Sequence, residues 1–221
     1  MSNKEMLAKV DHTLLKPYAT WADIRQICED AIAYHTATIC IPPSYIGRIR
    51  EAYGDQVTIC TVIGFPLGYQ VTEVKVAEAK KALEDGASEI DMVINIGDAK
   101  GGRFDAVTEE IRTLKKAVGD HVLKVIIETC YLTEEEKIEL CHCVTEAGAD
   151  FIKTSTGFGS AGANLEDVKL LRANVGPQVK VKAAGGIRSI ADMEDFINAG
   201  ADRLGTSSAI QLIKGENSSG Y

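Results

Sequence analysis

Short apolar segments rich in β-branched residues recur along the whole chain, and amphipathic segments separate them. Their length and composition are typical of buried strands. We predict eight strands, at residues 11–15, 37–42, 57–63, 89–95, 122–128, 150–155, 179–184 and 202–206. Amphipathic stretches with a helical period lie between them, most clearly at 72–85, 103–117, 133–147 and 189–199. Strands that alternate with helices predict a parallel sheet.

The connections from helix to strand repeat two patterns in alternation. Three of them read DGASEI, AGADFI and AGADRL, and the three others read YGDQV, VGDHV and VGPQV. A period of two units suits a closed barrel, whose odd and even strands contribute separate interior layers. An open sheet has two edges and gives no reason for this regularity. We therefore predict one (β/α)8 TIM-barrel domain over residues 1–221, with a short flexible tail at about 214–221.

Composition narrows the choice of partners and compartment. The 221 residues are 45% hydrophobic and carry a net charge of −8, which argues against nucleic acid or an anionic membrane as the main partner. The first residues lack an apolar signal region, and no apolar run reaches membrane-spanning length. Six cysteines in a chain of this size do not indicate a disulfide framework. Four of them lie within or beside apolar runs, as expected of small core residues in a reducing cytoplasm.

Lysines recur on the strand faces that should point into the barrel. Successive side chains of a strand alternate between two faces, and a barrel strand turns its apolar face toward the helices. This parity turns Lys153 inward, together with Lys124, Lys182 and Asp91. We expect the four side chains to converge near the carboxyl ends of the strands, where barrel active sites are built.

A structural interpretation is that each lysine forms a satisfied interior ion pair. Three lysines on three successive predicted strands argue against it, because buried like charges are costly. Asp91 and Glu128 can neutralise only some of these charges. A functional site is therefore the better interpretation.

Glycine-bearing turns follow the last three predicted strands, at 154–160, 183–189 and 204–210. Backbone N–H groups and hydroxyls in such turns can hold an anion, and barrels of this type commonly bind phosphate after strands seven and eight. One such turn alone is ordinary turn chemistry. Together, the turns predict a phosphorylated small-molecule ligand.

A phosphate site beside interior lysines indicates carbonyl chemistry through a Schiff base. A lysine with the usual pKa of about 10.4 needs about 4–5 kcal/mol to titrate near 7. A second ammonium about 5 Å away supplies on the order of 3 kcal/mol at an effective dielectric of about 20. Partial desolvation can supply the rest, so two lysines on adjacent strands suit a nucleophile and its activator. We expect no metal, because the four histidines lack ligand spacing and the CHC segment at 141–143 lies in a predicted helix.

Six motifs in a fixed order make the chain resemble the deoxyribose-phosphate aldolase family of class I aldolases over nearly its whole length. They are DHTLLKP (11–17), EIDMVINIG (89–97), LKVIIET (123–129), FIKTSTGF (151–158), VKAAGGIR (181–188) and GTSS (205–208). The resemblance implies reversible cleavage of 2-deoxy-D-ribose 5-phosphate to acetaldehyde and D-glyceraldehyde 3-phosphate. It places this reaction in deoxyribonucleoside catabolism, without a cofactor.

The resemblance also implies residue roles. Lys153 would form the Schiff base, and Lys182 would perturb it electrostatically. Asp91, with an ordered water, would move protons at the carbinolamine and enamine stages, and Lys124 would support the network. Tyr221, at the end of a tail that otherwise looks like a disordered terminus, would assist proton transfer at the enamine carbon. The phosphate would be held by Gly157, Gly185, Gly186, Arg188, Gly205, Ser207 and Ser208.

Three further positions have open interpretations. Phe158 stands where some relatives have lysine, which would give the phosphate one charge fewer. Cys40 either lies near the substrate or is a buried spacer. Asp11 either pairs with Lys182 or caps the first strand.

Two rival functions stay open at the level of sequence. One is another phosphosugar aldolase or isomerase on the same barrel, although an isomerase would not need paired interior lysines. The other is a non-enzymatic barrel that binds a phosphorylated metabolite, which would not need an activated amine. The resemblance further implies a homodimer or homotetramer.

Overall fold

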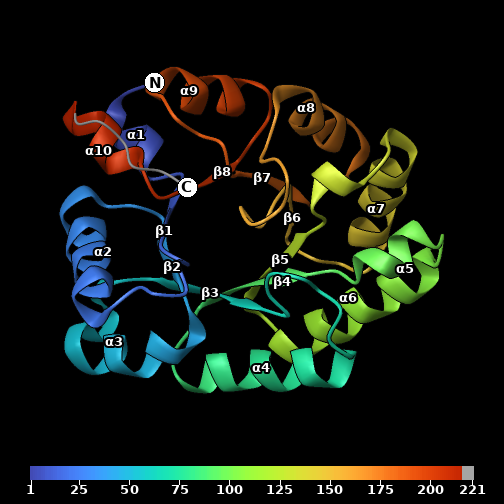
Figure 1. Cartoon of the computed structure of the whole chain (residues 1–221), viewed down its shortest axis with the longest axis horizontal. Helices are drawn as coiled ribbons and strands as arrows, with labels where there is room; N and C mark the ends of the chain where they lie inside the picture. Colours follow the sequence, from blue (N-terminus) through green and yellow to red (C-terminus); the bar gives the residue numbers. More distant parts are fainter. Residues whose placement is uncertain (216–221) are drawn as a thin grey trace.

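The computed structural model describes residues 1–215, in which eight parallel strands close into a barrel (Figure 1). The order of the strands around the barrel is their order in the chain. The strands are β1 (Val10–Thr13), β2 (Thr38–Ile41), β3 (Ile59–Ile63), β4 (Glu89–Val93), β5 (Val122–Ile126), β6 (Phe151–Lys153), β7 (Lys180–Ala184) and β8 (Arg203–Thr206). The predicted (β/α)8 fold is confirmed, and each predicted strand overlaps an observed one.

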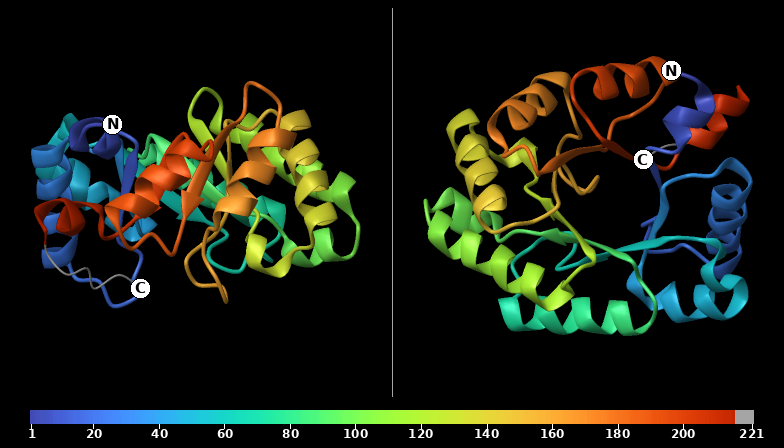
Figure 2. Two further views of the ribbon diagram at one scale, coloured as in Figure 1. Left: turned by 90° about the horizontal axis from the view of Figure 1, so that it is seen from above. Right: turned by 180° about the vertical axis from the view of Figure 1, so that it is seen from behind.

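Helices surround the barrel on its outside (Figures 1 and 2). The α-helices are α1 (Asn3–Leu7), α2 (Trp21–Tyr34), α3 (Ile46–Tyr53), α4 (Thr72–Glu84), α5 (Ile96–Lys100), α6 (Phe104–Val118), α7 (Glu134–Glu146), α8 (Leu165–Asn174), α9 (Ile190–Asn198) and α10 (Ala209–Lys214). Short 3₁₀ turns are η1 (Pro43–Tyr45), η2 (Gly54–Gln56) and η3 (Thr129–Tyr131). Across residues 1–215, no helix has the length and apolar character that crossing a membrane requires.

Local sequence explains where several helices begin and end. Thr133 and Glu136 form a capping box at the start of α7, and Ser189 caps α9 in the same way. Gly148, just after α7, has a φ angle of 77°, a conformation that glycine adopts at little cost. Helix α8 ends differently, because its C-cap is Val175 in an extended conformation.

Apolar side chains form two separate clusters. The larger lies between strands and helices, and it includes outward-facing residues such as Ile90, Met92 and Val181. The smaller lies inside the barrel, where Phe65 packs against Leu15, Cys40, Cys60 and Val62. Because neighbouring residues on a strand face opposite ways, the residues between the outward-facing ones fill the interior. Charged side chains occupy the rest of that space.

Five strands, β1, β2, β4, β5 and β6, end one or two residues earlier than their apolar pattern predicts. β4 stops at Val93, and Asn95 becomes the N-cap of the short helix α5, which the pattern did not predict. β6 stops at Lys153 instead of continuing to residue 155. Lys153 therefore lies at the carboxyl end of its strand, on the edge of the barrel where the sequence placed the site.

Candidate active site

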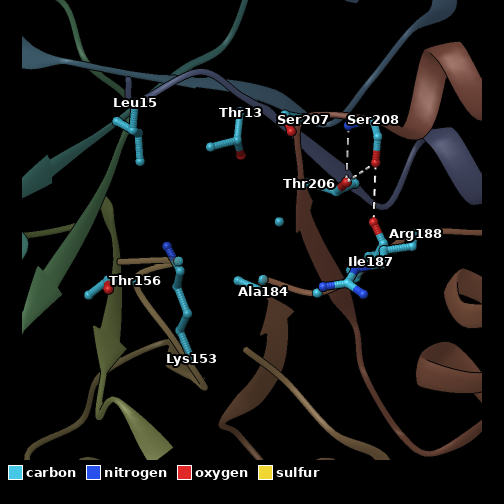
Figure 3. A pocket seen from close by; sticks show the side chains of 14 residues that line it. Thr13, Leu15, Lys153, Thr156, Ala184, Ile187, Arg188, Thr206, Ser207 and Ser208 are labelled. Carbon is cyan, nitrogen blue, oxygen red and sulfur yellow. Dashed lines mark hydrogen bonds between the residues drawn. The ribbon is translucent and has the colours of Figure 1, made fainter. Parts of the chain in front are cut away.

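Lys153 lines a cavity of about 260 Å³ at the carboxyl ends of the strands. The residue is 3% exposed, and its Nζ donates a hydrogen bond to Oδ2 of Asp91 over 2.7 Å. Figure 3 shows its side chain extending into the cavity beside Thr156. A small molecule in the cavity can therefore reach this amine.

Asp91 joins the three interior lysines. Its Oδ2 accepts hydrogen bonds from Nζ of Lys153 and of Lys182, each over 2.7 Å. Its Oδ1 accepts from Nζ of Lys124 over 2.9 Å and from the thiol of Cys60 over 3.1 Å. Strand register explains this, because Asp91 pairs with Lys124 between β4 and β5, and Lys153 pairs with Lys182 between β6 and β7. The structure thus brings together the four side chains that were predicted to point inward from the alternation of side chains along each strand.

Three more charged residues extend this network. Asp11 contacts Lys182 and lies 2.6 Å from Arg203, so it is a partner of Lys182. Glu89 lies 2.6 Å from Nζ of Lys124. Within residues 1–215 the network holds four cationic groups against three carboxylates, namely Lys124, Lys153, Lys182 and Arg203 against Asp11, Glu89 and Asp91. Loss of one proton would make it neutral, so one uncharged amine suits this cluster.

Glu89 and Arg203 were not predicted as members of the site, although the alternation of side chains along strands turns both inward. Glu89 precedes Asp91 by two residues on β4, so the two side chains lie on the same face of the strand. Arg203 lies on the inner face of β8. From the sequence, Glu128 was a second carboxylate, beside Asp91, that could neutralise some of the lysines. The Glu128 carboxylate instead accepts hydrogen bonds from Thr156.

The buried charges hold one another in ionised form. Burial alone would raise the pKa of Asp91, but the three lysines lower it well below its usual value. The pKa of Asp11 is likewise lowered, because Lys182 and Lys124 outweigh the effect of burial. Burial alone would lower the pKa of Lys182, but Asp11 and Asp91 raise it. At neutral pH, Lys182 is therefore a charged ammonium close to Lys153.

The glycine-bearing turns form another wall of the cavity. Figure 3 shows Arg188, Ser207 and Ser208 across the cavity from Lys153. Arg188 is exposed, so its guanidinium can meet an anion there. All the residues that the resemblance assigns to phosphate line this cavity, namely Gly157, Gly185, Gly186, Arg188, Gly205, Ser207 and Ser208.

Some hydrogen-bond donors of these turns are already used within the protein. Asp192 accepts the backbone N–H groups of Arg188 over 2.8 Å and of Ser189 over 3.0 Å. The N–H of Ser208 donates to Oγ1 of Thr206 over 3.1 Å, and its hydroxyl donates to a backbone carbonyl. The set of free donors is therefore smaller than the turn pattern predicted.

Three predicted site residues lie behind Lys153 and do not line the cavity. Asp91, Lys124 and Lys182 are all fully buried. Cys40 is also fully buried and belongs to the apolar cluster inside the barrel, which favours its interpretation as a spacer. These residues can act on a ligand only through Lys153 or through a water molecule.

Phe158 is 45% exposed, and its ring meets that of Phe65 edge to face with 5.4 Å between centroids. It follows Gly157, a residue of the cavity wall. Tyr221 lies outside the described residues, and so does most of the predicted tail. The role of Tyr221 stays a prediction.

Two groups of side chains in residues 1–215 have donor atoms close enough together for a cation, namely Cys40, Cys60 and Asp91, and Asp11, Cys60 and Glu89. Their carboxylates already bind lysines, so a cation would have to displace an ammonium group. Burial raises the pKa of Cys60 well above its usual value, which keeps it a thiol and a poor ligand. These donors suit the lysine network better than a metal ion.

Comparisons with known proteins show the family to which the chain belongs. The model of the DeoC/LacD family aldolases matches residues 5–210. Deoxyribose-phosphate aldolase of Clostridium botulinum (strain Alaska E43 / Type E3) is 65% identical over 221 residues, the full length of both chains. Deoxyribose-phosphate aldolase of Clostridioides difficile (strain 630) is 56% identical over 99% of this chain and 100% of its own.

A solved structure is also similar over nearly the whole chain. Deoxyribose phosphate aldolase from Aeropyrum pernix, described as a tetramer, superimposes with a TM-score of 0.89 at 35% identity, over 97% of this chain and 92% of that one. The chain therefore belongs to the DeoC/LacD family of aldolases and is an aldolase, a type of lyase.

Proposed function

We propose that this chain reversibly cleaves 2-deoxy-D-ribose 5-phosphate to D-glyceraldehyde 3-phosphate and acetaldehyde, in the catabolism of deoxyribonucleosides. One observation carries the proposal. Within residues 1–215, the buried network contains three lysines, and Lys153 is the one of them that lines the cavity. The wall of the same cavity that carries Arg188 suits a phosphate group. Relatives that are 56% and 65% identical carry the name of this activity.

Lys153 is the nucleophile in this mechanism. Its uncharged amine adds to the C1 aldehyde of the open-chain sugar, and the carbinolamine loses water to give a Schiff base. The protonated Schiff base accepts the electrons of the C2–C3 bond. As that bond breaks, the C3 hydroxyl loses its proton and becomes the aldehyde of glyceraldehyde 3-phosphate. The enamine then takes a proton at C2, and water releases acetaldehyde and the free amine.

Asp91 and Lys182 manage charge and protons in this scheme. Asp91 contacts both amines through one oxygen, so it can accept the proton that leaves Lys153. Because the lysines hold the pKa of Asp91 well below its usual value, the carboxylate passes this proton on to an ordered water. Lys182 stays charged and disfavours a second positive charge beside it. Lys124 holds the other oxygen of Asp91 in place.

A product assay with the full chain tests the proposal. With 2-deoxyribose 5-phosphate as substrate, we expect acetaldehyde and glyceraldehyde 3-phosphate in equal amounts, and neither from the Lys153→Met variant. A single rearranged sugar phosphate would indicate an isomerase instead. Cleavage of only a different sugar phosphate would indicate another aldolase, and binding without turnover a non-enzymatic barrel. Each of these three results would overturn the proposal.

We also propose that the reaction needs no metal or organic cofactor and that the chain is a cytoplasmic homodimer or homotetramer. A Schiff base on Lys153 supplies the electron sink that a cofactor would otherwise provide. The six cysteines are free, as is typical of a reducing compartment. The description of the Aeropyrum pernix relative as a tetramer supports self-association. Full activity in excess chelator is expected if no metal is needed. The molar mass from light scattering tests whether the chain forms a homodimer or homotetramer.

A further inference from the structure

Glu128 has a backbone conformation that is uncommon for a residue with a side chain. Its φ and ψ angles are 54° and 67°, in the left-handed region. The residue follows β5 and is 2% exposed. Such conformations persist where the surrounding structure enforces them, and they cluster at functional sites. The contacts of the Glu128 carboxylate show what this conformation achieves.

The Glu128 carboxylate binds Thr156, which lies in the turn after β6. Its Oε1 accepts the backbone N–H of Thr156 over 3.1 Å, and its Oε2 accepts the Thr156 hydroxyl. The two segments are also joined by their main chains, because the N–H of Thr129 donates to the carbonyl of Thr154 over 2.9 Å. A Cβ atom at Gly159 would lie 3.1 Å from Cδ of Glu128. The turn therefore packs closely against the carboxylate that it binds.

These contacts fix the direction of the Thr156 hydroxyl. A hydroxyl offers one hydrogen and two acceptor lone pairs. The hydrogen goes to Glu128, and one lone pair receives the N–H of Phe158 over 3.0 Å. Thr156 lines the cavity next to Lys153 (Figure 3). The remaining lone pair thus makes Thr156 an acceptor for a ligand that is bound to Lys153.

We propose that Glu128 is a positioning residue, which fixes Thr156 as the acceptor for a hydroxyl group of the sugar substrate. The inference rests on the proposed function, in which Lys153 binds C1 and the sugar carries hydroxyls at C3 and C4. A threonine hydroxyl without such a partner can rotate and donate instead, and the carboxylate removes that alternative before the substrate binds. Acetaldehyde has no hydroxyl group. Glu128 therefore supports cleavage of the sugar without supporting formation of the Schiff base itself.

Two measurements on the full chain separate these steps. One is kcat/KM for cleavage of 2-deoxyribose 5-phosphate, and the other is the rate at which acetaldehyde and borohydride label Lys153. In Glu128→Gln, an amide nitrogen faces the Thr156 hydroxyl, which then turns its hydrogen toward the cavity. We expect cleavage to fall about 10- to 100-fold, because a polar pair at the substrate is lost. Labelling should stay within about twofold of wild type.

Variants of Thr156 provide the matched series. Thr156→Val should lose about as much cleavage as Glu128→Gln, and the double variant should lose no more than either, because the two residues act as one unit. Thr156→Ser keeps the hydroxyl and should retain most of the activity. Thr129→Val is the control, because Thr129 is also 2% exposed and its hydroxyl has no hydrogen-bond partner among residues 1–215. It should change neither measurement.

Three results would overturn this role of Glu128: equal losses of cleavage and labelling in Glu128→Gln, additive losses in the double variant, or wild-type cleavage in Thr156→Val. If Glu128→Gln does not fold, Glu128→Asp replaces it, because the shorter side chain keeps the charge but withdraws from Thr156. The same split between cleavage and labelling is then expected. Failure of the wild-type chain to become labelled at Lys153 would instead overturn the proposed function.

Discussion

Lys153 and Lys182 are register partners on β6 and β7, and their Nζ atoms both lie 2.7 Å from the same oxygen of Asp91. The two nitrogens can be no farther apart than twice that distance. Asp11 and Asp91 keep Lys182 charged in spite of its burial. Lys153 faces the cavity, whereas Lys182 does not line it. The pair thus consists of a fixed cation and an amine that a ligand can reach.

Gly205→Ala should impair catalysis by displacing Lys182. A Cβ atom at this position would lie 2.9 Å from Cβ of Ala184 and 3.1 Å from Cε of Lys182. The ammonium would have to move relative to Asp91, so we expect kcat to fall at least about tenfold. Gly47→Ala is the control, because an added Cβ there would meet nothing within 4 Å. An unchanged kcat in Gly205→Ala would argue against a role for the position of Lys182.

Arg188→Gln should weaken recognition of the phosphate and spare the chemistry. Arg188 lies on the cavity wall opposite Lys153 (Figure 3). A charge-assisted contact of this kind contributes about 1.5–3 kcal/mol, so we expect KM for 2-deoxyribose 5-phosphate to rise at least about tenfold. Cleavage of unphosphorylated 2-deoxyribose should not change. Equal losses on both substrates would place the role of Arg188 elsewhere.

Phe158→Lys should strengthen binding of the phosphorylated substrate. Phe158 follows Gly157 on the cavity wall and is 45% exposed, so a longer cationic side chain can remain hydrated there. We expect a lower KM for 2-deoxyribose 5-phosphate at low ionic strength and a smaller effect at high salt, because salt screens an exposed charge. Phe158→Met serves as the uncharged control. A KM independent of salt in both variants would contradict an electrostatic effect.

Asp11→Asn should reduce stability at neutral pH and reduce sensitivity to acid. Although burial opposes it, the cations around Asp11 hold its pKa below the usual 3.8, so its charge stabilises the fold above about pH 4. This contribution is lost as the pH falls from that value toward the lower pKa of the folded state. Urea unfolding should show a loss of about 3–5 kcal/mol at pH 7 and a smaller loss at pH 3. A loss that does not depend on pH would contradict this.

The barrel and its inward lysines could be predicted because both follow from the alternation of side chains along strands. That rule turned Asp91 and Lys153 inward, and applied to every strand it also assigns Glu89 and Arg203 to the interior. Which charges meet depends on strand register, which is set when the barrel closes. A hydrophobic pattern on one strand does not contain that information.

Other contacts depend on conformations that no periodicity encodes. The bond from Thr156 to Glu128 requires a left-handed residue after β5 and a particular turn after β6. Lys75 and Glu110 form a buried pair at 2.8 Å between α4 and α6, although charged residues on amphipathic helices are usually assigned to solvent. Such details follow from tertiary packing and not from local sequence.

Reductive trapping decides whether Lys153 is the amine that forms the Schiff base. The full chain is treated with acetaldehyde and borohydride, and the two-carbon adduct is located by peptide mass spectrometry. We expect the adduct on Lys153, no adduct on Lys124 or Lys182, and none in the Lys153→Met variant. An adduct on another lysine, or no adduct on the wild-type chain, would contradict the assignment of Lys153 as the nucleophile.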